Sequence, residues 1–181
     1  GVIRTTWLGD MALAPSEVFS LVCDTLMETI VTLSGNVQTE LADVAAIGAS
    51  LESTPYGPVQ RLASTITAGT RVSTESFIEA AADARQSLNY HGRIPAAVWL
   101  GAQRLSPADF LVTAAQLLRR LVLDGDSLPL DLTVHSGMID GERHVHENVW
   151  GWPVFPENFS APGILEHARL QTWTLKPATL V

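Results

Sequence analysis

The stretch WLGDMALAPSEV at residues 7–18 recurs in altered form as WLGAQRLSPADF at residues 99–110. In both copies Trp-Leu-Gly is followed at the same spacing by a leucine, a proline and an acidic residue. The apolar positions stay in step further along the chain, at the pairs Phe19/Leu111, Val22/Ala114, Leu26/Leu118 and Ile30/Val122. Repetition at a fixed offset indicates a repeat architecture, in which neighbouring units close one core together. We therefore expect one module to be present twice.

The helices of this module are indicated by their end signals. Ser106 and Pro107 suit an N-cap and the first helical position, and Asp109 stands where a capping-box acid belongs. We expect a mainly helical α+β fold in which each copy consists of Trp-Leu-Gly, a helix, a connector and a second helix. Apolar periodicity and similar end signals predict four helices, near 15–33, 74–90, 107–123 and 162–174.

The two copies differ in what precedes Trp-Leu-Gly. The second copy has a helix and then HGRIPAAV at 91–98, and the first copy lacks both. We therefore expect the chain to be the C-terminal part of a longer protein, with repeats of approximately 1–92 and 93–181 in one compact domain. Trp7 and Trp99 recur before a helix in each copy and are expected to anchor the core.

Residues 128–150 show the two-residue periodicity of β-strands. Asp140-Gly141 is a favoured two-residue turn, which predicts a β-hairpin with this dipeptide at its tip. The apolar residues that alternate with proline or polar residues before the turn are Leu128, Leu130, Leu132 and Val134.

This register gathers histidines on one face of the predicted hairpin. His135 lies opposite His146, and His144 points to the same side as His146. Three imidazoles with Asp131 or Glu142 nearby are a candidate ligand set for zinc. The alternative is an ordinary solvated face, because the matching stretch of the first copy has no histidine.

A loop rich in proline and glycine follows the histidines. It carries Trp150, Trp152 and Phe155, with Asn148 and Glu157 interleaved. Aromatic rings beside amide and carboxylate groups are typical of carbohydrate-binding surfaces, since rings stack on the C–H faces of sugars. The alternative is that these rings close the end of a small core.

The composition restricts the function classes. The net charge of −8 argues against binding to nucleic acid or anionic membranes, which require clusters of Lys and Arg. No apolar run approaches the ~20 residues that span a bilayer. The chain is 46% hydrophobic and 17% charged, which predicts that another domain or another subunit covers part of its surface.

Cys23 lies among apolar residues and is expected to be a small buried hydrophobe.

The segment HGRIPAAV, with VSTESFIEAAADARQSL before it and LSPADFLVTAAQLL after it, resembles the pseudomurein-binding repeat family and related surface-protein repeats. The resemblance covers residues 74–118 and implies a non-catalytic domain that attaches to cell-wall glycans outside the cell or at its surface. The matched positions are Phe77, Ala81, Gly92, Arg93, Ile94, Pro95, Val98, Ser106, Phe110 and Leu111.

These observations favour a binding or anchoring domain for cell-wall or extracellular polysaccharide. No G-x-S-x-G, G-x-G-x-x-G or Walker motif occurs in the sequence, so nothing in it indicates a serine hydrolase or a nucleotide-binding enzyme. The partners expected are a polysaccharide and an upstream domain of the same protein. Two alternatives stay open. One is a structural accessory domain packed against an upstream catalytic domain, and the other is a metal-dependent hydrolase that uses the three histidines.

Overall fold

A computed structural model describes residues 1–8, 11–34, 54–145, 161 and 163–176 of the chain, and it shows a mixed helix and strand (α+β) fold. The four predicted helices are confirmed. They are α1 (Pro15–Ser34), α3 (Thr74–His91), α4 (Pro107–Leu118) and α5 (Ile164–Gln171). Helix α4 continues as a π-helical turn, η1 (Arg119–Leu123), and helix α5 continues as a 3-10 turn, η3 (Thr172–Thr174).

The strands in the described part of the chain are short and form two-stranded pairs. The antiparallel pairs are β2 (Thr6–Leu8) with β3 (Met11–Leu13), β5 (Val98–Leu100) with β6 (Gln103–Leu105), and β4 (Arg71–Ser73) with β7 (Asp131–Thr133). The parallel pair is β1 (Val2–Ile3) with β8 (Met138–Ile139). Two of the pairs are hairpins of consecutive strands, and the other two join segments far apart in the sequence.

A chain of aromatic rings runs through the core. Phe110 of α4 stacks on Phe77 of α3 at 5.1 Å between ring centroids, and it packs against Phe19 of α1 at 5.5 Å. Trp173 of η3 meets Phe19 edge-on at 6.3 Å. Offset and edge-on contacts of this kind stabilise beyond the area that they bury. The rings therefore join α1, α3, α4 and the segment after α5 into one core.

Helix α3 begins and ends where its sequence predicts. The hydroxyl of Ser73 accepts a hydrogen bond from the Ser76 N–H at 3.5 Å, which caps the first turn. At the other end Gly92 adopts a left-handed conformation with φ of 61° and donates its N–H to the Leu88 carbonyl at 2.8 Å. The apolar face of this helix is buried, at Phe77, Ala81, Ala84 and Leu88.

The hairpin predicted for 128–150 is wrong. β7 pairs with β4, which places Leu132 opposite Val72, and β8 pairs with β1, which places Ile139 opposite Ile3. The predicted tip at Asp140-Gly141 lies in a 3-10 turn, η2 (Asp140–His144). The local apolar alternation is real, but it does not specify which strand is the partner. Here the partners are brought to β7 and β8 by the packing of distant segments.

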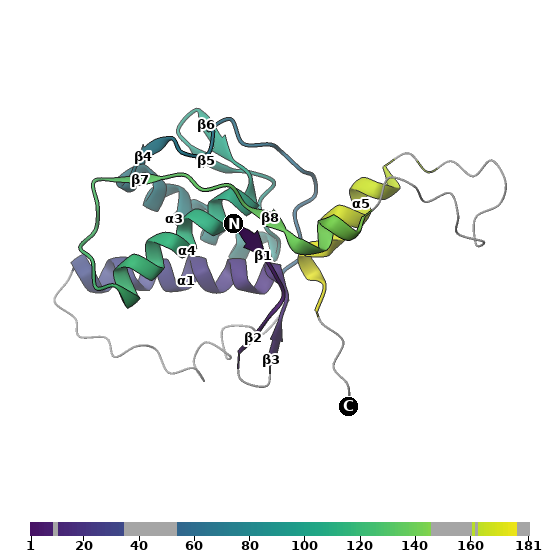
Figure 1. The fold of residues 1–181 in the computed structure, drawn as a ribbon, viewed down its shortest axis with the longest axis horizontal. Helices are drawn as coiled ribbons and strands as arrows, with labels where there is room; N and C mark the ends of the chain where they lie inside the picture. The colour runs from purple at the N-terminus through teal and green to yellow at the C-terminus, as the bar shows by residue number, and fades with distance from the viewer. Residues whose placement is uncertain (9–10, 35–53, 146–160, 162, 177–181) are drawn as a thin grey trace.

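The two tryptophans of the repeated stretch do not anchor the core, and the expectation that they do is wrong. Trp7 is 51% exposed and Trp99 is 52% exposed. Successive side chains of a strand point to opposite faces, so the burial of Val98 and Leu100 turns the intervening Trp99 outward. Figure 1 shows the two hairpins on opposite sides of the helices, with β5–β6 above α4 and β2–β3 below α1.

Candidate functional site

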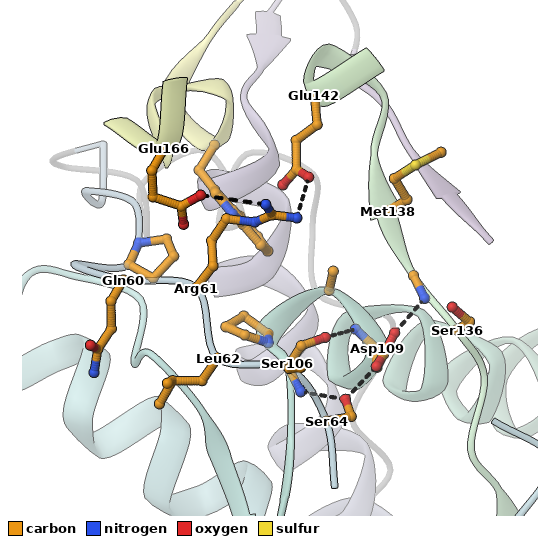
Figure 2. A pocket seen from close by; sticks show the side chains of 16 residues that line it. Gln60, Arg61, Leu62, Ser64, Ser106, Asp109, Ser136, Met138, Glu142 and Glu166 are labelled. Carbon is orange, nitrogen blue, oxygen red and sulfur yellow. Dashed lines mark hydrogen bonds and ion pairs between the residues drawn. The ribbon is translucent and has the colours of Figure 1, made fainter. Parts of the chain in front are cut away.

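A cleft of about 820 Å³ opens beside the N-terminal end of α4. Its walls are the segment 58–64, the residues around β8, the turn η2 and helix α5. Figure 2 shows Arg61 reaching across the cleft toward Glu142 and Glu166, and Ser64, Ser106 and Asp109 lie together at its floor. The cleft is therefore lined by polar groups from four separate segments.

The guanidinium of Arg61 joins two of those segments. Its Nη2 lies 2.9 Å from Oε2 of Glu142 in η2, and its Nη1 lies 3.5 Å from Oε2 of Glu166 in α5. Burial raises the pKa of the Glu142 carboxyl, although the nearby charge of Arg61 acts in the opposite direction. Arg61 is thus already matched by two carboxylates, and its evident role is to hold η2 and α5 together.

The floor of the cleft is a closed hydrogen-bond network. Ser64 Oγ accepts from the Ser106 N–H at 2.7 Å and donates to Asp109 Oδ2. Asp109 Oδ1 accepts from the Gly137 N–H at 2.7 Å, and a Cβ at Gly137 would overlap the carbonyl of Ala108. The Ser64 hydroxyl and both Asp109 oxygens are therefore committed to holding chain segments together.

This network does not supply the parts of a nucleophilic centre. An activated serine needs an adjacent general base that another group orients. Among the described residues that line the cleft there is no histidine and no cysteine. The chemistry available there is hydrogen bonding and charge pairing.

The exposed tryptophans of the two hairpins are two further candidate sites. Trp99 lies opposite Arg104 in the β5–β6 register, and the Arg104 guanidinium carbon is 5.8 Å from the Trp99 ring centroid, within the range of a cation–π contact. Arg104 Nε donates to the Ala63 carbonyl at 3.1 Å, and the Arg104 N–H donates to Thr65 Oγ1 at 2.9 Å. These contacts fix the surroundings of the Trp99 ring while half of the side chain stays in water.

The first hairpin presents its ring in the same register but with a smaller neighbour. Trp7 lies opposite Ala12, as Trp99 lies opposite Arg104. Thr5, two residues before Trp7, is exposed and supplies a hydroxyl group. Both hairpins therefore combine an accessible aromatic face with polar neighbours, which is the chemistry that stacks on a sugar ring and bonds to its hydroxyl groups.

All five of the predicted ligand-binding residues lie outside the described residues. This holds for Trp150, Trp152, Phe155, Asn148 and Glu157 of the aromatic loop. The proposal that this loop binds a ligand therefore stays a prediction.

The metal site predicted at His135, His144 and His146 stays a prediction, because only part of it is described, although the strands before it do not pair in the register that was expected to align the ligands. His135 is exposed just after β7, where its N–H donates to Thr113 Oγ1 at 3.0 Å, and His144 is exposed at the end of η2. Asp131 is exposed in β7, Glu142 faces Arg61, and His146 lies outside the described residues. Within the described ranges no three His, Cys, Asp or Glu side chains are grouped closely enough to hold a metal ion.

Cys23 matches its expected role. The side chain is fully buried in α1, and burial, with a smaller contribution from the Asp24 charge, raises the pKa of its thiol to about 12. A thiol that stays protonated at neutral pH is a poor nucleophile, so Cys23 acts as a small apolar side chain.

Sequence reasoning missed Arg61, Ser64 and Arg104. Nothing in the local sequence marks Arg61 or Ser64, because their partners come from elsewhere in the chain. The outward orientation of Trp99 had no sequence signal either, because Val98, Trp99 and Leu100 are all apolar. Only the structure shows that the three side chains alternate between buried and exposed, as in a half-buried strand.

Comparison with protein-family models, with curated proteins and with solved structures finds no match to this chain. In the part of the chain that the structure describes, no helix combines the length and apolar character needed to cross a membrane.

Proposed function

We propose that this protein is a non-catalytic domain that binds polysaccharide of a cell wall or extracellular matrix through the tryptophans of its two hairpins. The observation that carries the proposal is the equal exposure of these rings, 51% for Trp7 and 52% for Trp99, at the same register position of two separate hairpins. Apolar surface left in water costs about 25 cal/mol per Å². A sugar face that covers these rings recovers part of that cost.

We further infer that the two hairpins belong to two copies of one module. The first unit comprises β2, β3 and α1 (residues 6–34), and the second comprises β5, β6 and α4 (residues 98–118). In each unit the helix begins with a proline two residues after the second strand of the hairpin, at Pro15 and Pro107. This correspondence supports the internal repeat that the sequence suggests, and one ring per unit follows from it.

The family resemblance of residues 74–118 supports the same function. It covers α3, the second hairpin and α4, and it implies attachment to wall glycans at the cell surface. The loop with Trp150, Trp152, Phe155, Asn148 and Glu157 is a further candidate surface for the same ligand. The cleft beside Arg61 is not part of the proposal, because its polar groups are already engaged with one another.

The proposal is tested by retention on insoluble peptidoglycan and on chitin. The wild type should be retained on the polysaccharide, and the Trp7→Ala/Trp99→Ala double variant should not. Each single variant should bind about tenfold more weakly than the wild type, which corresponds to ~1.4 kcal/mol. Tyr90→Ala is the matched control, since Tyr90 is an aromatic residue of α3 that is 84% exposed. Thermal unfolding verifies that every variant is folded.

Two results would contradict the proposal. If the double variant and the wild type were retained equally, the ligand would bind elsewhere, and Trp152→Ala would then test the aromatic loop. If neither were retained, the domain would not bind these polysaccharides, and the structural accessory role would be the better interpretation.

A further inference from the structure

We propose that the two hairpins are independent sites on opposite sides of the domain, so that one molecule bridges two polysaccharide strands. This inference rests on the proposed function and adds cross-linking to it. The juxtaposition that carries it is the placement of the two exposed rings, Trp7 and Trp99, on hairpins separated by the helices.

The separation of the hairpins follows from what each one packs against. β3 contacts α1, whereas β5 contacts α3 and β6 contacts α4. In Figure 1 the helices lie between the two hairpins, and a separation seen in projection is a lower limit of the separation in space. One sugar residue therefore cannot cover both rings.

The core also fixes the two hairpins relative to each other. α1 packs against both α3 and α4, Phe19 of α1 contacts Phe110 of α4, and Arg85 of α3 pairs with Asp24 of α1 at 2.5 Å. Each hairpin is joined directly to a helix of this core, since β3 ends two residues before α1 and β6 ends two residues before α4, and these connections limit how far the hairpins can move toward each other. A strand bound on one side consequently leaves the opposite site open for a second strand.

The two sites have the same ring but different neighbours. Arg104 lies against Trp99, and its backbone and side chain are held by Thr65 and Ala63. Ala12, at the equivalent position in the first hairpin, offers Trp7 no such contact. A ring whose surroundings are fixed loses less conformational freedom on binding, so we expect the Trp99 site to bind more tightly.

A two-layer capture experiment tests bridging with the full chain. The insoluble polysaccharide retained in the binding assay, peptidoglycan or chitin, is loaded with protein and washed, and fluorescent soluble fragments of the same polysaccharide are then added. Wild type should hold the fragments. Trp7→Ala and Trp99→Ala should each remain on the solid to some extent but capture fragments only at background. Tyr90→Ala should behave as wild type. Light scattering verifies that each protein has the mass of one chain.

The possible outcomes separate the two proposals. If wild type is not retained on the solid at all, the proposed function fails and the bridging inference fails with it. If wild type is retained but captures no fragments, or if either single variant still captures them at the wild-type level, polysaccharide binding stands and bridging is overturned. Loss of capture in both single variants, with residual retention in both, supports two opposed sites.

Discussion

In both hairpin–helix units an acidic side chain in the first turn of the helix interacts with the backbone N–H of the residue just before the helix. In the first unit the hydrogen bond is direct, whereas in the second unit it passes through another side chain. Glu17 Oε2 accepts from the Ala14 N–H at 2.8 Å. Asp109 is shorter by one methylene, and the Ser64 hydroxyl fills the gap by accepting from the Ser106 N–H and donating to Asp109. Both helix starts are thus satisfied, but the second one needs a residue from outside the unit.

The other oxygen of each carboxylate also has different partners in the two units. Glu17 Oε1 accepts from Thr54 at 2.7 Å and pairs with Lys176 at 2.6 Å, whereas Asp109 Oδ1 accepts from the backbone of Gly137. The burial of Glu17 on its own would raise the pKa of its carboxyl. Hydrogen bonds from Lys176, Ala14 and Thr54, together with the Lys176 charge, lower that pKa below its ordinary value of 4.5 instead. Two similar local sequences therefore depend on different distant residues.

The largest expected difference between the units lies in their cores. Leu26 is fully buried, whereas its counterpart Leu118 is only partly buried against the core. Leu26→Ala should lower the free energy of unfolding by about 2–5 kcal/mol. Leu118→Ala should cost roughly half of that or less, because less apolar surface is removed from contact. Urea titration measures both, and equal losses would contradict the asymmetry.

A smaller effect concerns the Glu17 carboxylate and should depend on pH. Because the folded-state pKa of Glu17 is lowered, its stabilisation is present above pH 4.5 and is lost as the pH falls through the lower, folded-state value. Glu17→Gln should cost about 1.5–3 kcal/mol at neutral pH, the scale of a hydrogen bond to a charged group. The difference from wild type should shrink below pH 4.5. Glu75→Gln, in the exposed first turn of α3, is the control. A difference that stays constant with pH would show that the Glu17 charge is not responsible.

The smallest effect tests whether Ser64 compensates for the methylene that Asp109 lacks relative to Glu17. Ser64→Ala removes the bridging hydroxyl and should cost about 1 kcal/mol. Adding Asp109→Glu to that variant should recover part of the loss, because the longer side chain reaches the Ser106 N–H as Glu17 reaches that of Ala14. Urea titration of the single and double variants gives the coupling energy. If Asp109→Glu were equally harmful with and without Ser64, the comparison between the units would fail.

The parts of the fold that short-range signals determine were predictable from the sequence. Ser73, Gly92, Ser106 and Pro107 mark helix ends through contacts within a few residues, and the structure confirms those ends. The hairpin over 128–150 was predicted wrongly because its strands pair across the chain, with β4 and β1. A strand of two or three residues carries too little pattern to specify a distant partner.

The candidate sites were less accessible to sequence reasoning for the same reason. The Arg61 contacts with Glu142 and Glu166 join three segments of the chain, and no local pattern links them. Trp99 was assigned to the core from its place before a helix, and its neighbours Val98 and Leu100 are also apolar, so the sequence does not indicate which of the three side chains faces outward. The alternation of the strand, rather than the helix that follows, determines where this side chain points.

The pairing of Glu17 with Lys176 has a consequence for the order of events during synthesis. The two residues are 159 positions apart, and the Trp173 ring that covers Phe19 comes from the same late segment. Helix α1 leaves the ribosome before this segment, so the Glu17 carboxylate lacks its contact with Lys176, and Phe19 lacks its contact with Trp173, until the segment has emerged. Contacts of such long sequence separation form late and slowly. Helix α1 is therefore completed by a residue that is synthesised 159 positions after Glu17.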